Sequence, residues 1–413
     1  MSKITSTLSQ ASLGIAVMLM ILEMAMAKDC PGFTNRVILM ERMRIESVIN
    51  EVMEMPVVTV TASRSPRSEG GLHDYYSEGD YWWPNPVDPG GPYIRRDGES
   101  NPDNFNQHRE AIISFSEIVG ELTTAYLLTG ERRYAKRVAD HLGAWFSNSE
   151  TRMNPHLEFA QAIKGRVSGR SIGIIDAVHL AEVAIAVHHL KQHDMLPTAI
   201  LDDTVQWFTQ YLHWLNTHPY GIEEKTHPNN HSVAWSLQAA AFATLLDNRS
   251  QIDAIRSRLS DIYLEKMMTD NGSFPAELAR TKPYGYSLFM FDLVAGVTSL
   301  VSNDTHDMWQ ARSTNGHRVS DMYGFIVPYI ADKSAWPYAR DIQYWDQWPA
   351  RHVALVLGAI ALNEPDYLAL WSNLKTAMGT FEVRRNLPLK NPLIWLPHDC
   401  LEKSTKAPVE ETG

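Results

Sequence analysis

The strongest constraint on the fold is a repeated alternation of long helical stretches and short breaks from His108 onwards. In the first stretch, apolar residues such as Ile112, Phe115 and Ile118 recur at three- and four-residue steps, and Thr129-Gly130 then interrupts the pattern. The same alternation predicts further helix pairs at 172–193 with 199–216, 231–246 with 251–268, 286–301 with 318–331, and 349–362 with 365–377. Strand patterns are almost absent from this region, so the sequence predicts an all-α fold.

A series of antiparallel helix hairpins can stack into an open solenoid or close into an α/α toroid. Tetratricopeptide-type solenoids repeat at a fixed short period, whereas the hairpins of this chain are irregularly spaced. The sequence therefore favours an α/α toroid, an incomplete barrel of hairpins whose loops at one end form a cleft. With 44% hydrophobic residues and no low-complexity segment, the 413-residue chain is expected to form one large domain.

The N-terminal segment predicts export. Lys3 precedes an apolar run from Ala11 to Leu22, and the small residues Ala25 and Ala27 follow it, which is typical of a secretory signal peptide cleaved after Ala27. No later segment is apolar for long enough to cross a bilayer. We therefore expect a periplasmic or secreted monomer without membrane contact after cleavage. Its expected parts are a signal peptide at 1–27, an N-terminal extension at 28–72, the toroid at 73–400 and a C-terminal tail at 401–413.

The cysteines and the net charge restrict the partners. Cys30 and Cys400 lie at opposite ends of the expected mature chain. In an oxidising compartment they would either form one disulfide that ties the termini together or stay as two unrelated thiols. The formal net charge of −11 argues against nucleic acid or an anionic membrane as a partner. An anionic substrate would therefore need local positive contacts.

Residues 73–105 differ from the rest of the chain, because they are dense in Pro, Gly, Asp and aromatic residues and have no regular period. A long ordered loop of this kind is usually functional. It offers aromatic faces for pyranose rings and arginines for carboxylates, namely Tyr81, Trp82, Trp83, Arg95 and Arg96. The alternative is a buried plug over the toroid. Arg166 and Arg170 would add positive charge to the cleft or form structural salt bridges.

The segment THPNNHSVAW, residues 226–235, places two asparagines and a histidine at the start of a predicted helix. Asn229 or Asn230 can cap that helix, which is a purely structural role. An amide and an imidazole at a helix N-terminus also suit a carboxylate, because free backbone N–H groups and the helix dipole favour negative charge. We expect Asn229 to cap the helix at the edge of a substrate site, and Asn230 and His231 to face a carboxylate.

A second polar segment begins at Arg280 and contains Lys282, Tyr284 and Tyr286, just before the helix predicted from Ser287. Two cations and two phenols would be ordinary on a solvated loop. A cation beside a tyrosine also lowers the pKa of the phenol from its usual value of about 10, because it favours the phenolate. In a substrate site, Lys282 and Tyr284 would bind substrate and Arg280 and Tyr286 would take part in the reaction, whereas on a solvated loop none of the four would have such a role.

Together these residues meet the requirements of β-elimination in a polyuronate. The C6 carboxylate must be neutralised so that the C5 proton becomes acidic, that proton must be removed, and the leaving glycosidic oxygen must be protonated. Asn230, His231 and Arg280 can stabilise the enolate-like charge that develops. A tyrosine, alone or with a histidine, can carry the two proton transfers.

The chain resembles the alginate lyase-like polysaccharide lyases, whose fold is an α/α toroid. The residues that carry the resemblance are Asn229-Asn230-His231-Ser232 with Trp235, Asn271-Gly272-Ser273 with Glu277-x-x-Arg280, Tyr286, and the loop sequences YWWPNP and GGPYIRRDGESNP. The resemblance implies an anionic β-1,4-linked uronate polymer as substrate, either alginate (polymannuronate) or glucuronan.

The resemblance also implies roles for individual residues. Asn230, His231 and Arg280 would neutralise the carboxylate, and Tyr286 would act as base, acid or both. His231 is the alternative base for substrates whose C5 proton lies on the opposite face. Tyr284 is the alternative tyrosine, because this chain has Ser287 where the mannuronate-specific branch has its tyrosine.

Two other functions fit the sequence. An α/α-toroid glycoside hydrolase would need an acid and a base carboxylate across the cleft, and the candidates are Asp80, Glu158, Asp176 and Glu277. A non-catalytic glycan-binding protein would keep only the aromatic cleft. We expect no cofactor and no catalytic metal, since His189 and His193 have a helical spacing but no glutamate follows His189 to complete an HExxH motif.

Overall fold

The computed structural model describes residues 30–376, 380–396 and 401 of the chain. The predicted signal peptide, Cys400 and nearly all of the predicted C-terminal tail lie outside the described residues, so the choice between a disulfide and two separate thiols falls outside them too.

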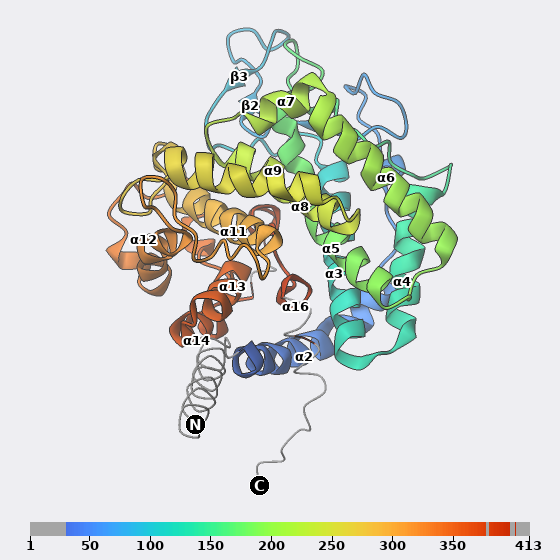
Figure 1. The fold of residues 1–413 in the computed structure, drawn as a ribbon. Helices are drawn as coiled ribbons and strands as arrows, with labels where there is room; N and C mark the ends of the chain where they lie inside the picture. Colours follow the sequence, from blue (N-terminus) through green and yellow to red (C-terminus); the bar gives the residue numbers. More distant parts are fainter. Residues whose placement is uncertain (1–29, 377–379, 397–400, 402–413) are drawn as a thin grey trace, which may run out of the picture.

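Helices dominate the described part of the chain (Figure 1). The longer α-helices are α2 (Cys30–Glu54), α3 (Gln107–Thr129), α4 (Arg132–Leu142), α5 (Leu180–Gln192), α6 (Thr198–Thr217), α8 (Asn230–Leu245), α9 (Arg249–Arg258), α11 (Pro283–Val301), α12 (Val319–Ala331), α13 (Val353–Leu362) and α14 (Pro365–Asn373). The shorter ones are α7 (Pro219–Lys225), α10 (Pro275–Leu278), α15 (Phe381–Arg385) and α16 (Pro392–Trp395). Between them lie the 3₁₀ and π segments η1 (Val60–Ala62), η2 (Gly143–Ser147), η3 (Ser171–Ala177), η4 (Leu259–Met267), η5 (Lys333–Ala335) and η6 (Trp345–Gln347). The strands are β1 (Tyr76–Glu78), β2 (Trp82–Trp83), β3 (Ile94–Arg95) and β4 (Phe159–Ala162).

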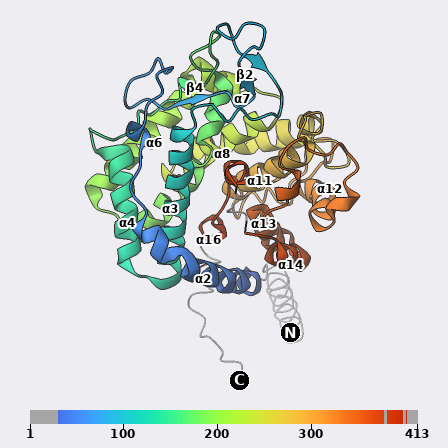
Figure 2. The same ribbon diagram turned by 180° about the vertical axis from the view of Figure 1, so that it is seen from behind.

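The helices form two concentric layers. In the inner row each helix packs against the next, in the order α3, α5, α8, α11 and α13. The outer helices α4, α6, α9, α12 and α14 pack against members of this row. Helix α2 contacts both α3 and α13, so it lies across the gap between the two ends of the row (Figure 1, Figure 2). The predicted α/α toroid is confirmed, and the segment expected to be an N-terminal extension contributes the helix that crosses this gap.

Helices α3 and α11 combine length with an apolar composition. By length and composition each is apolar enough to cross a membrane, with a mean hydropathy of 1.3, so the expectation that no later segment has this property is wrong. In the protein, however, 83% of the apolar window of α3 and 78% of that of α11 are buried. Both helices have neighbours on several sides, which explains why they are apolar on most sides.

The predicted helix breaks match the structure in most places. Helix α3 ends at Thr129, and Gly130 follows in the left-handed conformation, φ 71°, that suits a helix C-cap. Two predicted helices start later than expected, because η3 occupies the first part of one and α13 begins at Val353. In η3, a Cβ added to Gly173 would lie only 2.6 Å from the Cβ of Ala160 in β4. Close packing on β4 therefore accompanies the departure of η3 from α-helical geometry.

Residues 73–105 form small strand pairs at one end of the toroid. Strand β1 pairs in parallel with β4, and β2 pairs antiparallel with β3. The strands were not predicted, because segments of two to four residues are too short to show an alternating pattern. Both views place β2 beside α7, the helix that leads into α8 (Figure 1, Figure 2). The loop is thus held next to the start of α8.

Candidate active site

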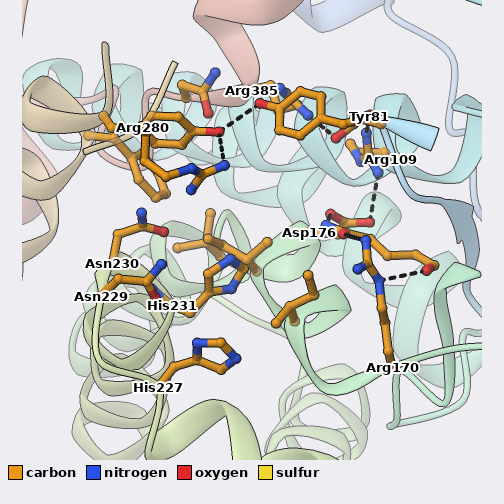
Figure 3. Close-up of a pocket in the computed structure, with 18 of the residues that line it drawn as sticks. Tyr81, Arg109, Arg170, Asp176, His227, Asn229, Asn230, His231, Arg280 and Arg385 are labelled. Carbon is orange, nitrogen blue, oxygen red and sulfur yellow. Dashed lines mark hydrogen bonds and ion pairs between the residues drawn. The ribbon is translucent and has the colours of Figure 1, made fainter. Parts of the chain in front are cut away.

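A pocket of about 270 Å³ lies between the loop at 73–105 and the starts of α8 and α11 (Figure 3). Its charged lining consists of five arginines and two aspartates: Arg95, Arg109, Arg170, Arg280, Arg385, Asp80 and Asp176. With the histidines neutral, the lining has an excess of three positive charges in a chain whose formal net charge is −11. The pocket therefore has the local positive contacts that an anionic substrate requires.

The start of α8 contributes a helix cap and three polar side chains. Asn229 is the N-cap, and its side-chain oxygen accepts the backbone N–H of His231 at 3.3 Å. Asn229, Asn230 and His231 all line the pocket, and in the view of Figure 3 they lie below Arg280. The structure thus places the capping role on Asn229 and leaves the side chains of Asn230 and His231 available to the pocket.

Asn230 is held in place by Glu277 of α10. The Glu277 carboxylate accepts the backbone N–H of Asn230 at 2.8 Å and its side-chain Nδ2 at 2.5 Å. Glu277 is fully buried, and this burial raises its pKa, although the hydrogen bonds from Asn230 oppose the shift. Because Nδ2 carries two hydrogens, the Asn230 amide keeps one N–H for a ligand.

His231 is oriented by a second buried glutamate. Its Nδ1 lies 2.8 Å from the Oε1 of Glu224, a fully buried residue of α7. We assign a proton to Nδ1 on the basis of this contact, which leaves Nε2 as the basic ring nitrogen. His227 packs beside His231 with ring centroids 5.3 Å apart, and burial together with His231 lowers the pKa of His227. His227 also lines the pocket and was missed in the sequence analysis.

Arg280 and Tyr286 form the opposite wall of this part of the pocket. The Nη2 of Arg280 donates to the Tyr286 hydroxyl at 2.8 Å, and the guanidinium lies 4.1 Å from the centroid of the phenol ring. Asp97 accepts from the same guanidinium at 3.2 and 3.4 Å. The hydroxyl of Tyr81 lies 2.8 Å from that of Tyr286. The Tyr286 hydroxyl is therefore placed between a cation and a second phenol.

The pKa of Tyr286 differs from the expectation. Burial raises this pKa well above its usual value, and Tyr81 adds to the increase, whereas Arg280 lowers it. The sequence revealed the neighbouring cation but not the burial, which has the larger effect. Tyr286 is consequently a neutral phenol at neutral pH.

Tyr284 lies outside the pocket, which corrects its expected roles as a substrate-binding residue and as the alternative catalytic tyrosine. Its side chain is fully buried, and its hydroxyl donates to the Tyr329 carbonyl at 2.9 Å. Both tyrosines belong to α11, which starts at Pro283. Residues two apart on a helix project in directions about 160° apart, so only one of the two can face the pocket.

Lys282 and Trp83 also lie outside the pocket lining, although both were expected to bind substrate. Lys282 is buried, its Nζ donates to Glu382 at 2.6 Å, and it lies 5.1 Å from the ring centroid of Tyr81. Trp83 donates through Nε1 to the Glu99 carbonyl at 2.9 Å. The local sequence did not predict the contact of Lys282 with Glu382 or that of Trp83 with the Glu99 carbonyl. The other expected substrate-binding residues do line the pocket, namely Tyr81, Trp82, Arg95, Arg170 and Asn229.

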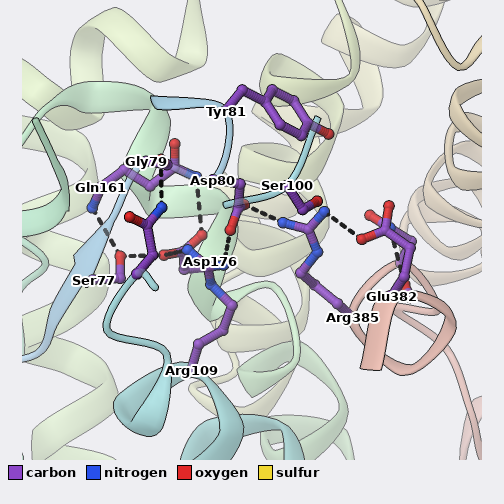
Figure 4. A network of polar contacts seen from close by, with 12 residues as sticks. Ser77, Gly79, Asp80, Tyr81, Ser100, Arg109, Gln161, Asp176, Glu382 and Arg385 are labelled. Carbon is purple, nitrogen blue, oxygen red and sulfur yellow. Dashed lines mark hydrogen bonds and ion pairs between the residues drawn. The ribbon is translucent and has the colours of Figure 1, made fainter. Parts of the chain in front are cut away.

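A network of charged side chains borders the pocket (Figure 4). Asp80 pairs with Arg109 at 2.5 Å and also with Arg385, and Arg385 in turn pairs with Glu382 at 2.7 Å. Burial raises the pKa of Asp80, but the two arginines outweigh this effect and lower it to about 2. Arg385 belongs to α15, near the other end of the chain. No local sequence motif connects Arg385 to the other pocket residues, so its place in the site was not predicted.

The carboxylates considered for a glycoside hydrolase do not form an acid and base pair in the pocket. Asp80 is held ionised by its two arginines. Asp176 accepts hydrogen bonds from four side chains, those of Tyr75, Ser77, Arg109 and Gln161. Glu158 and Glu277 do not line the pocket. The arrangement therefore lacks the accessible carboxylic acid that glycoside hydrolysis needs.

Among the described residues, no group of three or more His, Cys, Asp and Glu side chains is arranged to hold a metal ion.

Comparisons with known proteins agree with this geometry. The alginate lyase family model matches residues 59–336. A crystal structure of an alginate lyase from Bacteroides ovatus matches with a TM-score of 0.71 and 29% sequence identity, over 84% of this chain and 92% of that chain. Alginate lyase A1-III from Sphingomonas species A1 matches with a TM-score of 0.52 and 14% identity, over 84% of this chain and 94% of that chain. At this identity the second match shows the fold alone. No curated protein sequence matches the chain.

Proposed function

The chain belongs to the alginate lyase family, and from this premise we propose that it cleaves a β-1,4-linked uronate polymer, alginate (polymannuronate) or glucuronan, by β-elimination. One observation carries the proposal. The Tyr286 hydroxyl and the Arg280 guanidinium, in contact at 2.8 Å, line the same pocket as Asn230 and His231. This set contains a proton-transfer group and three donors for one carboxylate.

In the proposed mechanism, Asn230 and Arg280 donate hydrogen bonds to the C6 carboxylate of the sugar whose C5 proton is removed. His231 is the third donor in the form that carries a proton on Nε2 as well as the one on Nδ1 that faces Glu224. Their hydrogen bonds become stronger as negative charge develops on the carboxylate, which lowers the barrier to proton removal. The buried glutamates Glu277 and Glu224 support this role, because each fixes one of the donors before substrate arrives.

The proton transfers are assigned to Tyr286. The base takes the C5 proton, the electron pair forms the C4–C5 double bond, the bond from C4 to the glycosidic oxygen breaks, and that oxygen takes a proton. Because Tyr286 is neutral before substrate arrives, its proton must first pass to solvent, which leaves a phenolate that Arg280 stabilises. The phenolate takes the C5 proton, and the phenol so formed donates that proton to the leaving oxygen, which restores the phenolate. For a C5 proton on the opposite face, the second candidate base is His231 with an unprotonated Nε2, and neutral Tyr286 is then the acid.

The test is incubation of the purified protein with polymannuronate, polyguluronate and glucuronan. Ultraviolet absorbance measures the unsaturated uronate that β-elimination leaves, and a reducing-end assay measures every cleavage. We expect both signals to rise together with at least one polymer. Reducing ends without absorbance would mean hydrolysis, and binding without either signal would mean a glycan-binding protein.

We also propose that the protein works outside the cytoplasm as a monomer. The signal-peptide pattern that ends at Ala27 supports the first part, export. N-terminal sequencing of the protein recovered from the periplasm and the medium should begin at Lys28, and light scattering should give the mass of one chain. Recovery only from the cytoplasm with an intact N-terminus would refute the first expectation, and a dimer mass would refute the second.

A further inference from the structure

Three cations beside the pocket have no carboxylate partner in the described part of the chain. Arg96 follows strand β3, and Lys164 and Arg166 lie in the turn after β4. Most other cations near the pocket are paired, as Arg95 and Arg280 are with Asp97. We call Arg96, Lys164 and Arg166 the cationic ridge.

Each cation of the ridge lies over an aromatic ring. The distances from the charged group to the ring centroid are 5.0 Å for Arg96 over Trp83, 5.5 Å for Lys164 over Tyr93 and 5.1 Å for Arg166 over Trp82. A ring attracts a cation through its quadrupole and so restricts where the cation lies. Unlike a carboxylate, it does not neutralise the charge. The ridge therefore presents positioned positive charges that are free for an anion.

The backbone under the ridge is well defined. Ile163 and Val167 exchange backbone hydrogen bonds of 2.9 and 3.1 Å, which closes a tight turn around Lys164 and Arg166. At the apex, Gly165 has φ +72°, and a Cβ there would lie 2.9 Å from the Cα of Pro92. Only glycine fits this approach between the turn and the β2–β3 connection.

The turn is also bonded to Tyr93, the residue before strand β3. The N–H of Tyr93 donates to the Lys164 carbonyl at 3.1 Å, and Nε of Arg166 donates to the Tyr93 carbonyl at 2.8 Å. These bonds join two segments far apart in the sequence. The backbone that carries Lys164 and Arg166 is therefore fixed against the segment that leads into β3 and Arg96.

The ridge is continuous with the pocket through Trp82. The ring of Trp82 lies under Arg166 and, at 6.0 Å, under Arg170. Trp82 and Arg170 both line the pocket. Burial lowers the pKa of Arg170 to about 10, and within the described residues its guanidinium donates hydrogen bonds only to Gln161. Positive charge without a carboxylate partner thus extends from the pocket out to Lys164 and Arg96.

We propose that the cationic ridge is an outer binding subsite for the polyuronate chain where it leaves the pocket. A polyuronate carries one carboxylate on each sugar, so successive sugars can meet successive separate cations. Because the ridge lies outside the pocket lining, it contributes to the binding of long chains and not to the reaction at the bond that is cleaved. The inference rests on the proposed function, since it takes the pocket substrate to be this polymer.

The test is the double variant Arg96→Gln/Lys164→Gln, which removes two charges whose side chains make no hydrogen bond within the described residues. At low ionic strength, we expect KM for the polymer to rise about three- to tenfold with kcat unchanged, which is the range for two exposed charge contacts. KM for the shortest oligosaccharide that is cleaved should not change. The rise should shrink in high salt, because salt screens exposed charges.

The matched control is Arg132→Gln/Lys136→Gln, which removes two exposed charges from α4, and it should leave KM for the polymer unchanged. An unchanged KM in the ridge variant, or an equal rise for short and long substrates, would overturn the inference. So would weaker binding to anionic lipid vesicles with unaltered binding to the polymer. If the wild type releases no unsaturated product, the proposed function fails. The affinities of the wild type and of the ridge variant for the polymer then still decide whether the ridge binds it.

Discussion

The carboxylate of Glu277 holds Asn230 at two points, its backbone N–H at 2.8 Å and its side-chain amide at 2.5 Å. Glu277 also accepts the backbone N–H of Arg280 at 3.2 Å through its own carbonyl oxygen. One buried residue thus connects two of the groups that we assign to the substrate carboxylate. The connection explains why a short helix of four residues, α10, is placed against the start of α8.

Replacement of Glu277 should therefore affect catalysis through Asn230. We expect Glu277→Ala to lower kcat/KM by about 10²-fold, because a small misplacement of a group that binds the transition state has a cost of this size. Glu277→Gln keeps one acceptor oxygen and should lose less. In an Asn230→Ala background, Glu277→Ala should have little further effect, because the partner through which it acts is gone. Full additivity of the two substitutions in kcat/KM would contradict the positioning role.

The two tyrosines at the start of α11 should respond in opposite ways. Tyr286→Phe removes the hydroxyl that contacts Arg280 and Tyr81, and we expect kcat to fall by about 10²- to 10⁴-fold, the usual contribution of a proton-transfer group. Tyr284→Phe removes one buried hydrogen bond and should cost about 1 kcal/mol of stability with activity retained. Steady-state kinetics and thermal melts of both variants measure this. Full activity of Tyr286→Phe would refute its assignment.

The helical part of the fold was predictable because the spacing of apolar residues in the sequence indicates helices and their buried faces. Inner helices such as α3 and α11 are apolar on most sides, and Gly130 marks a helix end through its backbone freedom. Short strands, by contrast, have no sequence period. Their pairing depends on contacts between segments that are far apart, such as that of β1 with β4.

The site was predictable where its residues are neighbours in sequence. Asn229, Asn230 and His231 form one motif, and Arg280 and Tyr286 lie six residues apart. Local sequence could not show which face of α11 is buried, so it left Tyr284 and Tyr286 as alternatives. It also could not show Arg385, which α15 brings in from a distant segment. His227 and Glu224 lie in or just before the segment 226–235, but nothing in the local pattern distinguishes their side chains from surface residues.

Asp341 is another distant residue that contacts the start of α11. Its two carboxylate oxygens accept the backbone N–H groups of Tyr284 and Gly285, each at 2.9 Å, so it caps the helix that carries Tyr286. We expect Asp341→Ala to lower kcat about tenfold with little change in KM, because the first turn of α11 loses its cap and Tyr286 loses its fixed position. Asp341→Asn keeps an acceptor oxygen and should restore part of the activity.

Asn248→Ala is the matched control for the cap. Asn248 caps α9 by accepting the backbone N–H of Gln251 at 3.1 Å, and it does not line the pocket. Its loss should lower the melting temperature as much as Asp341→Ala does, while kcat stays at the wild-type value. If Asp341→Ala lowers only the melting temperature, the cap has no catalytic consequence and the prediction fails.

Glu121 should make stability depend on pH. It contacts Arg44 at 3.0 Å between α3 and α2, and burial, helped by Glu117, raises its pKa from 4.5 to about 7 although Arg44 opposes the shift. A raised pKa means that the folded state binds the proton more tightly than the unfolded state. Its stabilising effect is therefore complete below about pH 4.5 and is lost as the pH rises through about 7. Urea unfolding of the wild type and of Glu121→Gln at about pH 5 and about pH 8 measures this. From the lower to the higher pH, the free energy of unfolding of Glu121→Gln relative to that of the wild type should rise by up to about 3 kcal/mol. A difference that is the same at both pH values would show that Glu121 is already ionised in the folded protein.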